Sequence, residues 1–213
     1  MNTMSSKNGQ NGSITAATYR RLLLLYIIGL LKDGIFGRKR IQKNVYFVSK
    51  KLTKKPFEYK HWTYGQYSED VDEVVMELIA SQLIFRQPLD SGASGHKYTL
   101  RYKDSLKYYQ SFLDGILGSE RQEIDKTLNE IGYLPDKELL TRAYIDLAEN
   151  QSGFGDILFR ANLSDKIPVP GINEEDCEEL ELSLNPRFVG AMSELAKGIE
   201  TGKIGTSQWK EIA

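Results

Sequence analysis

Cysteine and histidine are scarce in this chain, which has one cysteine and two histidines among its 213 residues. The lone Cys177 has no partner for an intramolecular disulfide, and the acidic residues around it disfavour a reactive thiolate. His61 and His96 do not stand at the spacing of zinc ligands, and they leave a His-dependent hydrolase little to work with. We therefore predict a non-enzymatic protein that holds no cofactor and no metal ion.

Apolar runs long enough to cross a membrane are also missing. The apolar stretch 22–31 has ten residues, about half of what a helix needs to span a bilayer. A charged turn at 32–34 follows it, in place of the small-residue cleavage site of a signal peptide. We expect a buried helix, no association with a membrane and a cytoplasmic location.

Charge is abundant but unevenly distributed. Charged residues make up 27% and hydrophobic residues 40% of the chain, which is typical of a soluble globular protein, and the net charge is −1. Residues 1–110 hold 18 Lys and Arg against 9 Asp and Glu, whereas residues 111–213 hold 10 against 20. The two parts have opposite net charges, which indicates a function in binding.

The hydrophobic pattern of the first half predicts three helices and a β-hairpin. The helices are expected at 13–32, 38–54 and 69–81, and the third follows a serine N-cap and opens with acidic residues. Two short strands, 83–86 and 97–101, flank a loop rich in Gly and Ser. This order of elements is typical of a winged-helix unit.

Helices are expected again over 103–117, 119–132 and 136–149. The predicted fold class is mainly α, with α+β character: a winged-helix-like helical domain with a small β-hairpin, followed by a helical C-terminal extension. Its expected parts are a flexible N-terminal tail at 1–12, the winged-helix-like domain at 13–150, a linker at 151–172 and an acidic helical C-terminal arm at 173–213.

Helix 38–54 is predicted to have a basic face. Its apolar residues Ile41, Val45, Val48 and Leu52 form one stripe, so the cations gather on the other side. This face would contact nucleic-acid phosphates or an acidic protein partner, or it is an ordinary solvated surface rich in lysine. The candidate binding residues are Arg38, Lys39, Arg40, Lys43, Phe47, Lys50, Lys51 and Lys54.

Two aromatic or apolar groups are candidates for partner binding. Trp62, Tyr64 and Tyr67 either line a recognition groove or, as we favour, clamp two helices together in the core. The arm holds an amphipathic helix at 186–199 and a short final helix, and either binds a partner groove or packs on the domain itself. Its candidate residues are Phe188, Met192, Leu195 and Trp209.

Two short motifs carry a resemblance to a known family. Residues 38–43 read Arg-Lys-Arg-Ile-Gln-Lys, and residues 62–68 read Trp-Thr-Tyr-Gly-Gln-Tyr-Ser. With the distal helix 134–144, they resemble YwgA-like proteins and the SocA-type (Panacea) antitoxin domains over roughly residues 20–150, although Gln66 stands where the family has proline. The resemblance implies a compact, winged-helix-like helical domain of bacterial and phage-associated proteins, some of which neutralise a toxin or act as adaptors, with no enzymatic reaction.

Two functions are therefore expected. The first is a non-enzymatic, antitoxin-like, adaptor or defence-associated protein that binds a protein partner, such as a toxin or a defence effector, through the domain and the acidic arm. The alternative is a winged-helix DNA-binding transcriptional regulator, whose basic helix face contacts phosphates. A homodimer is compatible with both.

Overall fold

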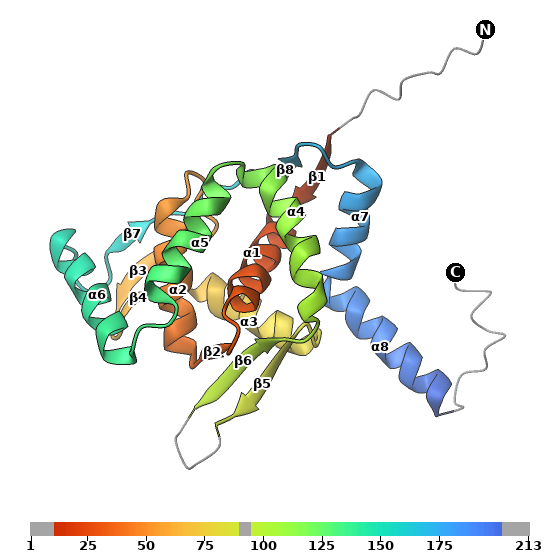
Figure 1. Ribbon diagram of the computed structural model, residues 1–213, viewed down its shortest axis with the longest axis horizontal. Helices are drawn as coiled ribbons and strands as arrows, with labels where there is room; N and C mark the ends of the chain where they lie inside the picture. The colour runs from red at the N-terminus through yellow and green to blue at the C-terminus, as the bar shows by residue number, and fades with distance from the viewer. Residues whose placement is uncertain (1–10, 90–94, 202–213) are drawn as a thin grey trace, which may run out of the picture.

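The computed structural model describes residues 11–89 and 95–201. In these ranges the fold is mainly helical with small antiparallel sheets, which confirms the predicted class at this level (Figure 1). None of the helices described has the length and apolar character that a membrane crossing requires.

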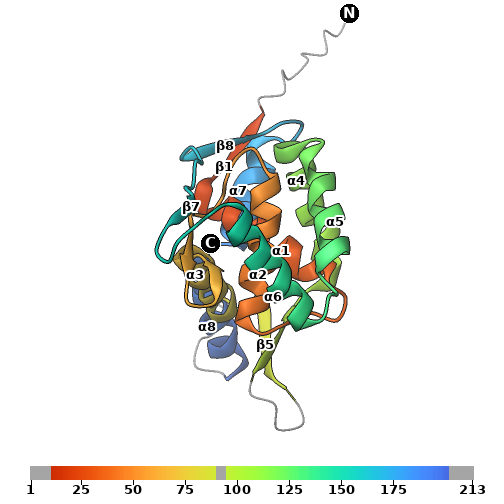
Figure 2. The ribbon, with the colours of Figure 1, turned by 90° about the vertical axis from the view of Figure 1, so that its left-hand side faces the viewer.

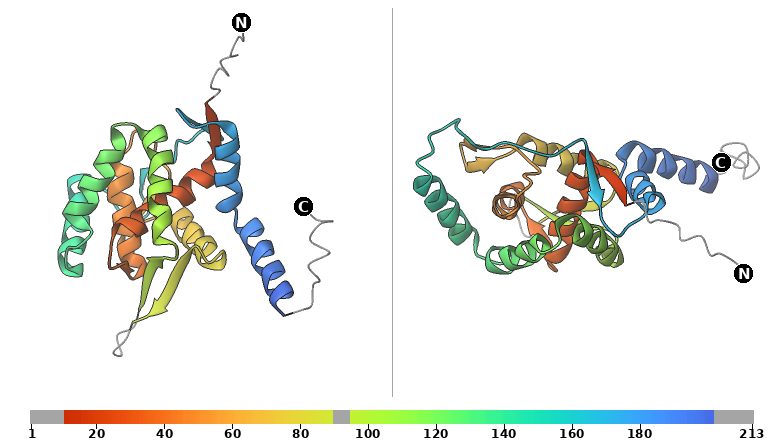
Figure 3. Two further views of the ribbon diagram at one scale, coloured as in Figure 1. Left: turned by 45° about the vertical axis from the view of Figure 1, so that its right-hand side comes forward. Right: turned by 90° about the horizontal axis from the view of Figure 1, so that it is seen from above.

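Helix α1 (Ala16–Leu30) lies at the centre of the helical body (Figures 1 and 3). It starts where the Thr15 hydroxyl accepts a hydrogen bond from the Thr18 amide, and its residues 22–28 are all buried. The apolar run therefore forms a central helix, as predicted. Four helices contact it: α2 (Arg38–Lys51), α3 (Glu69–Ala80), α4 (Leu106–Leu117) and α5 (Glu120–Ile131).

The predicted hairpin is present as β5 (Ile84–Pro88) and β6 (His96–Leu100), which pair in antiparallel fashion. β2 (Ile35–Phe36), between α1 and α2, adds to the other side of β6, so the strand order is β2-β6-β5. The hairpin extends away from the helical body in Figure 1, and residues 96–100 connect through η1 (Lys103–Ser105) to α4.

A second hairpin stands between α2 and α3. β3 (Tyr59–Trp62) pairs with β4 (Gly65–Tyr67) and, on its other side, with β7 (Ile157–Phe159). β4 packs against α2 and against α6 (Asp136–Glu149), which lies in front of α2 in the view of Figure 2. The aromatic segment that precedes α3 is thus held between two helices.

Residues 151–172 do not form the expected linker. They supply β7 and β8 (Lys166–Val169), and β8 pairs with β1 (Gly12–Thr15) at the N-terminal side of α1. Ile167 and Val169 alternate with exposed residues and lie in the hydrophobic core. Short strands interrupted by proline leave too weak a pattern to predict, and Pro168 is tolerated because β8 lies in a two-stranded sheet.

The acidic helix α7 (Glu174–Ser183) packs against β1, where Cys177, Leu180 and Leu184 belong to the core. The first half of the predicted C-terminal arm is therefore part of the helical body and not a detached segment. α8 (Pro186–Glu200) continues beyond it, contacts α3 and α7, and has no buried residue (Figure 3). The final short helix predicted around Trp209 lies outside the described residues, as does most of the predicted tail.

Candidate binding site

The two motifs of the sequence meet in one pocket at the start of α2. The pocket has a volume of about 370 Å³, and its walls are the first turns of α2, the β3–β4 hairpin and the start of α3. Motif 38–43 supplies the helical wall, and motif 62–68 supplies the turn opposite it. The pocket is lined by Arg38, Lys39, Gln42, Lys43, Trp62, Thr63, Tyr64, Gly65, Gln66, Tyr67, Glu69 and Asp72.

A second, larger pocket of about 810 Å³ adjoins the first. It lies between the start of α2, the β5–β6 hairpin and the start of α6, and three cations line both pockets: Arg38, Lys39 and Lys43. Arg86 of the hairpin faces into it as well, and Asp136 is the single carboxylate residue of its lining. The first turn of α2 therefore separates two adjoining hollows and presents positive charge to both.

Lys43 is the most deeply placed of these cations. Only 2% of the accessible surface of Lys43 is exposed. Its Nζ donates a hydrogen bond of 2.7 Å to the main-chain oxygen of Gln66. Gly65, next to it, has φ of +87°, and a Cβ at that position would lie 3.1 Å from the Lys43 Nζ. The positive φ favours glycine at this turn, and a Cβ there would be in tight contact with the lysine amine.

Gln66 connects this turn to α6. Its Nε2 donates a hydrogen bond of 2.7 Å to the main-chain oxygen of Ala143, and its own main-chain oxygen accepts from Lys43, so Gln66 joins the pocket lysine to a neighbouring helix. The Gln66 Oε1 is buried and has no hydrogen-bond partner among the described residues.

The electrostatic environment of Lys43 is unusual. Burial, and to a smaller extent the neighbouring charge of Lys39, lower the pKa of Lys43 to about 8. Among residues 11–89 and 95–201, no carboxylate oxygen lies within 4 Å of its Nζ. The Lys43 amine therefore has a main-chain carbonyl as its hydrogen-bond partner and no neighbouring carboxylate among the described residues.

Trp62 and Tyr64 form an exposed aromatic rim, so the favoured prediction that they lie in the core is wrong. Their residues are 43% and 57% exposed. The Lys39 Nζ lies 3.5 Å from the centroid of the Tyr64 ring, and the Trp62 ring stacks on Phe154 at 4.9 Å between centroids. Tyr67 is half-buried, and its hydroxyl donates to Asp72. Sequence reasoning did not find Phe154, because it is a single aromatic residue in a Gly-rich segment.

The predicted basic face of α2 does not exist as one surface. Arg40 bonds to Asp136 and donates to the main-chain oxygens of Gly132 and Leu134, so it holds the start of α6 in place. Lys50 pairs with Asp146 of α6. Both side chains have structural partners, because α5, α6 and β4 cover sides of α2 that periodicity alone predicts to be exposed.

The other candidates on this helix lie apart from the pocket. Phe47 is half-buried and packs on the core, with its ring 5.3 Å from that of Tyr46. Lys51 is the last residue of α2, and Lys54 follows the helix; both are exposed. The predicted binding set therefore divides into pocket cations, structural cations and solvated lysines.

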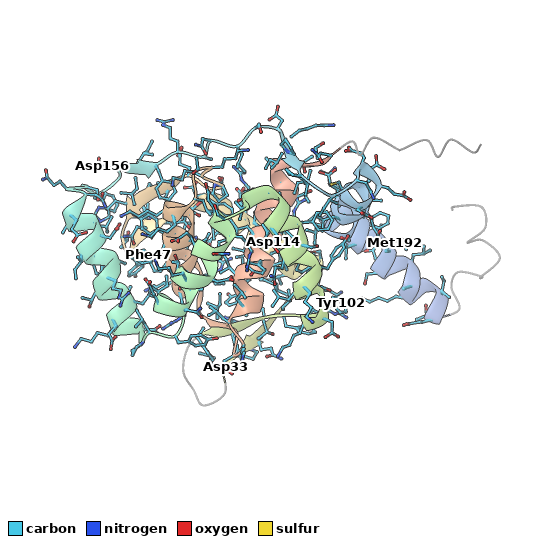
Figure 4. All side chains as sticks on the ribbon, turned by 45° about the horizontal axis from the view of Figure 1, so that its top comes forward. Asp33, Phe47, Tyr102, Asp114, Asp156 and Met192 are labelled. Carbon is cyan, nitrogen blue, oxygen red and sulfur yellow. The ribbon has the colours of Figure 1, made fainter. Side chains whose placement is uncertain are left out.

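The candidate residues of the arm are far from the pocket. Met192 lies on α8 at the end of the molecule opposite Asp156 (Figure 4), and α8 and α6 occupy opposite ends in Figure 1. Phe188 and Met192 are exposed, and Leu195 is half-buried. The acidic run of α7 does not mask the pocket, since its Glu174 and Glu181 accept hydrogen bonds from the amides of β1.

A metal centre is not formed by the described part of the chain, in which no group of three His, Cys, Asp or Glu side chains is close enough to hold an ion.

A comparison with protein-family models found no matching family, and comparisons with curated proteins and with solved structures found no similar chain. The resemblance to SocA-type and YwgA-like proteins therefore rests on the sequence motifs.

Proposed function

We propose that this chain is a non-enzymatic binding protein that receives a segment of a protein partner at the start of α2. The observation that carries this proposal is the meeting of motifs 38–43 and 62–68 as opposite walls of one pocket. Exposed Trp and Tyr side chains beside a pocket are characteristic of protein interfaces, because each combines a large apolar area with a polar edge.

The resemblance to SocA-type and YwgA-like proteins supports an antitoxin-like or adaptor role in the cytoplasm, with a toxin or a defence effector as partner. The proposed domain is winged-helix-like. The element order α1, β2, α2, α3, β5, β6 and the strand order β2-β6-β5 support it, with the β3–β4 hairpin inserted before the third helix.

A site-specific crosslinker tests the proposed binding surface. Tyr64 is replaced by p-benzoylphenylalanine in the full chain, and Tyr102, which is 54% exposed and precedes α4, serves as the matched control. Both variants are co-expressed with the products of the genes that flank the native gene, and irradiated. We expect a crosslinked partner from position 64 and none from position 102. Equal crosslinking from both, or none from position 64, would contradict the proposal.

The arm is proposed as a second contact surface through Phe188, Met192 and Leu195 of α8. A chain that ends at Asn185 removes α8 and retains the core residues of α7, whereas an end at Ile167 would also remove part of the core. Partner affinity that is unchanged in the chain ending at Asn185 would restrict recognition to the pocket.

A DNA-binding regulator is the second candidate function. It is favoured by the second pocket, where Arg38 and Lys39 of α2 face Arg86 of the β5–β6 hairpin. It is disfavoured by α3, which follows α2 as a recognition helix would and starts with Glu69, Asp70 and Asp72.

Salt dependence tests this alternative. Duplex binding by the full chain should weaken with a logarithmic slope of about −0.9 for each phosphate neutralised. The variant with Lys39→Glu and Arg86→Glu should then reduce the slope by about 2. A chain that binds no duplex at low salt excludes the regulator.

A further inference from the structure

We infer that the pocket at the start of α2 takes an acidic side chain of the partner, with its carboxylate against the Lys43 ammonium and an adjoining aromatic or apolar side chain against Tyr64 and Trp62. The inference rests on the proposed function, and it specifies the chemistry of the partner segment.

The first support is the missing counterion of Lys43. The guanidinium groups of Arg21, Arg40 and Arg121, whose side chains are at most 15% exposed, each have a carboxylate within 4 Å. Lys43 is more buried than any of them and has a main-chain carbonyl as its partner. Buried charges in proteins are normally paired. An incoming carboxylate would supply the partner that the chain supplies to these three guanidinium groups.

The second support is the position of this amine. Lys43 is among the residues that line both pockets, so both hollows lie beside the same basic residue. The first turn of α2 contains no acidic residue, and its N-cap Gly37 has no side chain to accept hydrogen bonds from the first amides. Arg38 pairs with Asp72 at 3.8 Å, so the helix dipole acts together with Lys39 and Lys43 to favour an anion.

The third support is the charge balance of the first pocket, which fits one carboxylate better than a chain of phosphates. Its lining contains the cations Arg38, Lys39 and Lys43, but Glu69 and Asp72 stand on the α3 side. These carboxylates would repel a polyanion, whereas a single negative charge is accommodated beside Lys43. A bidentate guanidinium fork, the usual phosphate ligand, is offered only by Arg38 at the exposed rim.

The aromatic rim explains why the acidic residue should have an apolar neighbour. Tyr64 lies beneath the Lys39 ammonium, and Trp62 is stacked on Phe154, so each ring already has a packing partner while it keeps an exposed surface. Side chains ordered before binding lose little conformational entropy when a partner covers them.

Two blocked peptides that differ in a single group test the inference on the full chain. Acetyl-Leu-Glu-Phe-amide and acetyl-Leu-Gln-Phe-amide are titrated at pH 7, and the side-chain resonances of ¹³C-labelled lysines are followed by NMR. We expect the Glu peptide to bind about tenfold more tightly than the Gln peptide, and to raise the pKa of Lys43 above its value of about 8 in the unbound chain. Equal affinities for the two peptides, or a pKa of Lys43 that the Glu peptide does not change, would overturn the inference.

Variants and a second anion sharpen this experiment. Lys43→Met should remove the preference for Glu, whereas Lys54→Met, at an exposed lysine outside the pocket, should retain it. If Lys43→Met does not fold, the comparison of the two peptides on the unmodified chain still decides the question. Inorganic phosphate that binds at Lys43 more tightly than the Glu peptide would overturn the assignment to a carboxylate and favour a phosphate ligand.

The outcomes separate this inference from the proposed function. A partner that crosslinks at position 64, together with equal affinity for the two peptides, would retain the binding surface and reject the acidic occupant. A Glu preference that depends on Lys43 without any crosslinked partner would retain the carboxylate site and reject a protein-binding role for its rim.

Discussion

Lys43 and Lys50 stand seven residues apart on α2, two turns of the helix, and therefore on nearly the same face. Lys50 meets Asp146 of α6, whose carboxylate also accepts a hydrogen bond of 2.5 Å from the Tyr46 hydroxyl. Lys43 meets the backbone of the β3–β4 turn and no carboxylate of the described residues. The same residue type on one helix is thus paired with a carboxylate at one position and with a main-chain carbonyl at the other, and the proposed ligand site is at the second.

Removing the counterion of Lys50 should produce the largest effect on stability. Asp146→Asn leaves the Lys50 ammonium without its anion and weakens the bond from Tyr46, so we expect the free energy of unfolding in urea to fall by about 2 kcal/mol. Glu149→Gln, at an exposed residue of the same helix, should change it by less than about 0.5 kcal/mol. Equal stability of the two variants would show that the Lys50 pair is a surface interaction only.

Lys43→Met should increase the free energy of unfolding, and the size of this increase should depend on pH. Because the folded pKa of about 8 is below the ordinary value of 10.5, the unfolded chain binds more protons between these values, and the Lys43 contribution to stability rises with pH in that window. Below pH 8 the fold bears the full free-energy cost of burying the charged Lys43 amine. The stability advantage of Lys43→Met over the unmodified chain should therefore shrink by about 1 to 2 kcal/mol between pH 8 and pH 9.5.

Denaturant unfolding at several pH values measures this advantage, with Lys54→Met as a control that should follow the unmodified chain. The measurements stay below pH 10, because above that pH buried tyrosines also change the free energy of unfolding. Burial and Asp125 raise the pKa of Tyr26 to about 12, for example, so this residue destabilises the fold once the unfolded tyrosine ionises. A constant difference between Lys43→Met and the unmodified chain would mean that the amine is not desolvated.

Tyr64→Ala should reduce binding without reducing stability. The ring is exposed and contacts Lys39, so its loss should change the free energy of unfolding by less than about 0.5 kcal/mol. The affinity for the partner should fall about tenfold, which corresponds to ~1.4 kcal/mol. Tyr102→Ala is the control and should leave the affinity unchanged. The measurements are calorimetric titration and thermal unfolding of the same samples.

A carboxylate placed at the pocket rim should have the smallest effect. Thr63 is exposed and lines the first pocket, so Thr63→Glu offers Lys43 and Lys39 an internal competitor. We expect the affinity for the Glu peptide to fall about threefold at low salt, and the loss to diminish as salt screens it. Thr63→Gln has nearly the same shape and no charge. An equal loss in both variants would indicate a steric cause and would weaken the comparison between the two lysines.

Local sequence patterns predicted the elements that depend on local chemistry. The apolar run 22–28 had to be buried, and the serine before the acidic residues of α3 had to cap a helix, since its hydroxyl accepts the Val71 amide. The β5–β6 hairpin followed from two β-prone runs around a Gly- and Ser-rich loop. The motifs that line the pocket were also identified, although nothing in their order showed that they face each other.

Pairings between distant segments were not predicted. β1 and β8 are separated by about 150 residues, and neither has an apolar pattern long enough to indicate a strand, so 151–172 resembled a linker. The division of the α2 cations has the same cause. Which sides of α2 are covered depends on α5, α6 and β4, and the carboxylates that neutralise Arg40 and Lys50 come from residues about 96 positions away.

Local sequence patterns were enough to predict a helical protein with one central apolar helix, a hairpin and two motifs that combine basic and aromatic residues. Periodicity and capping are local, and they act before distant segments meet. The identity of each ionic partner depended on the folded chain: it brought Asp136 to Arg40 and Asp146 to Lys50, and it placed the backbone of the β3–β4 turn beside Lys43. Ion pairing depends on distance in space, and the partners of these three cations come from segments that are far from α2 in the sequence.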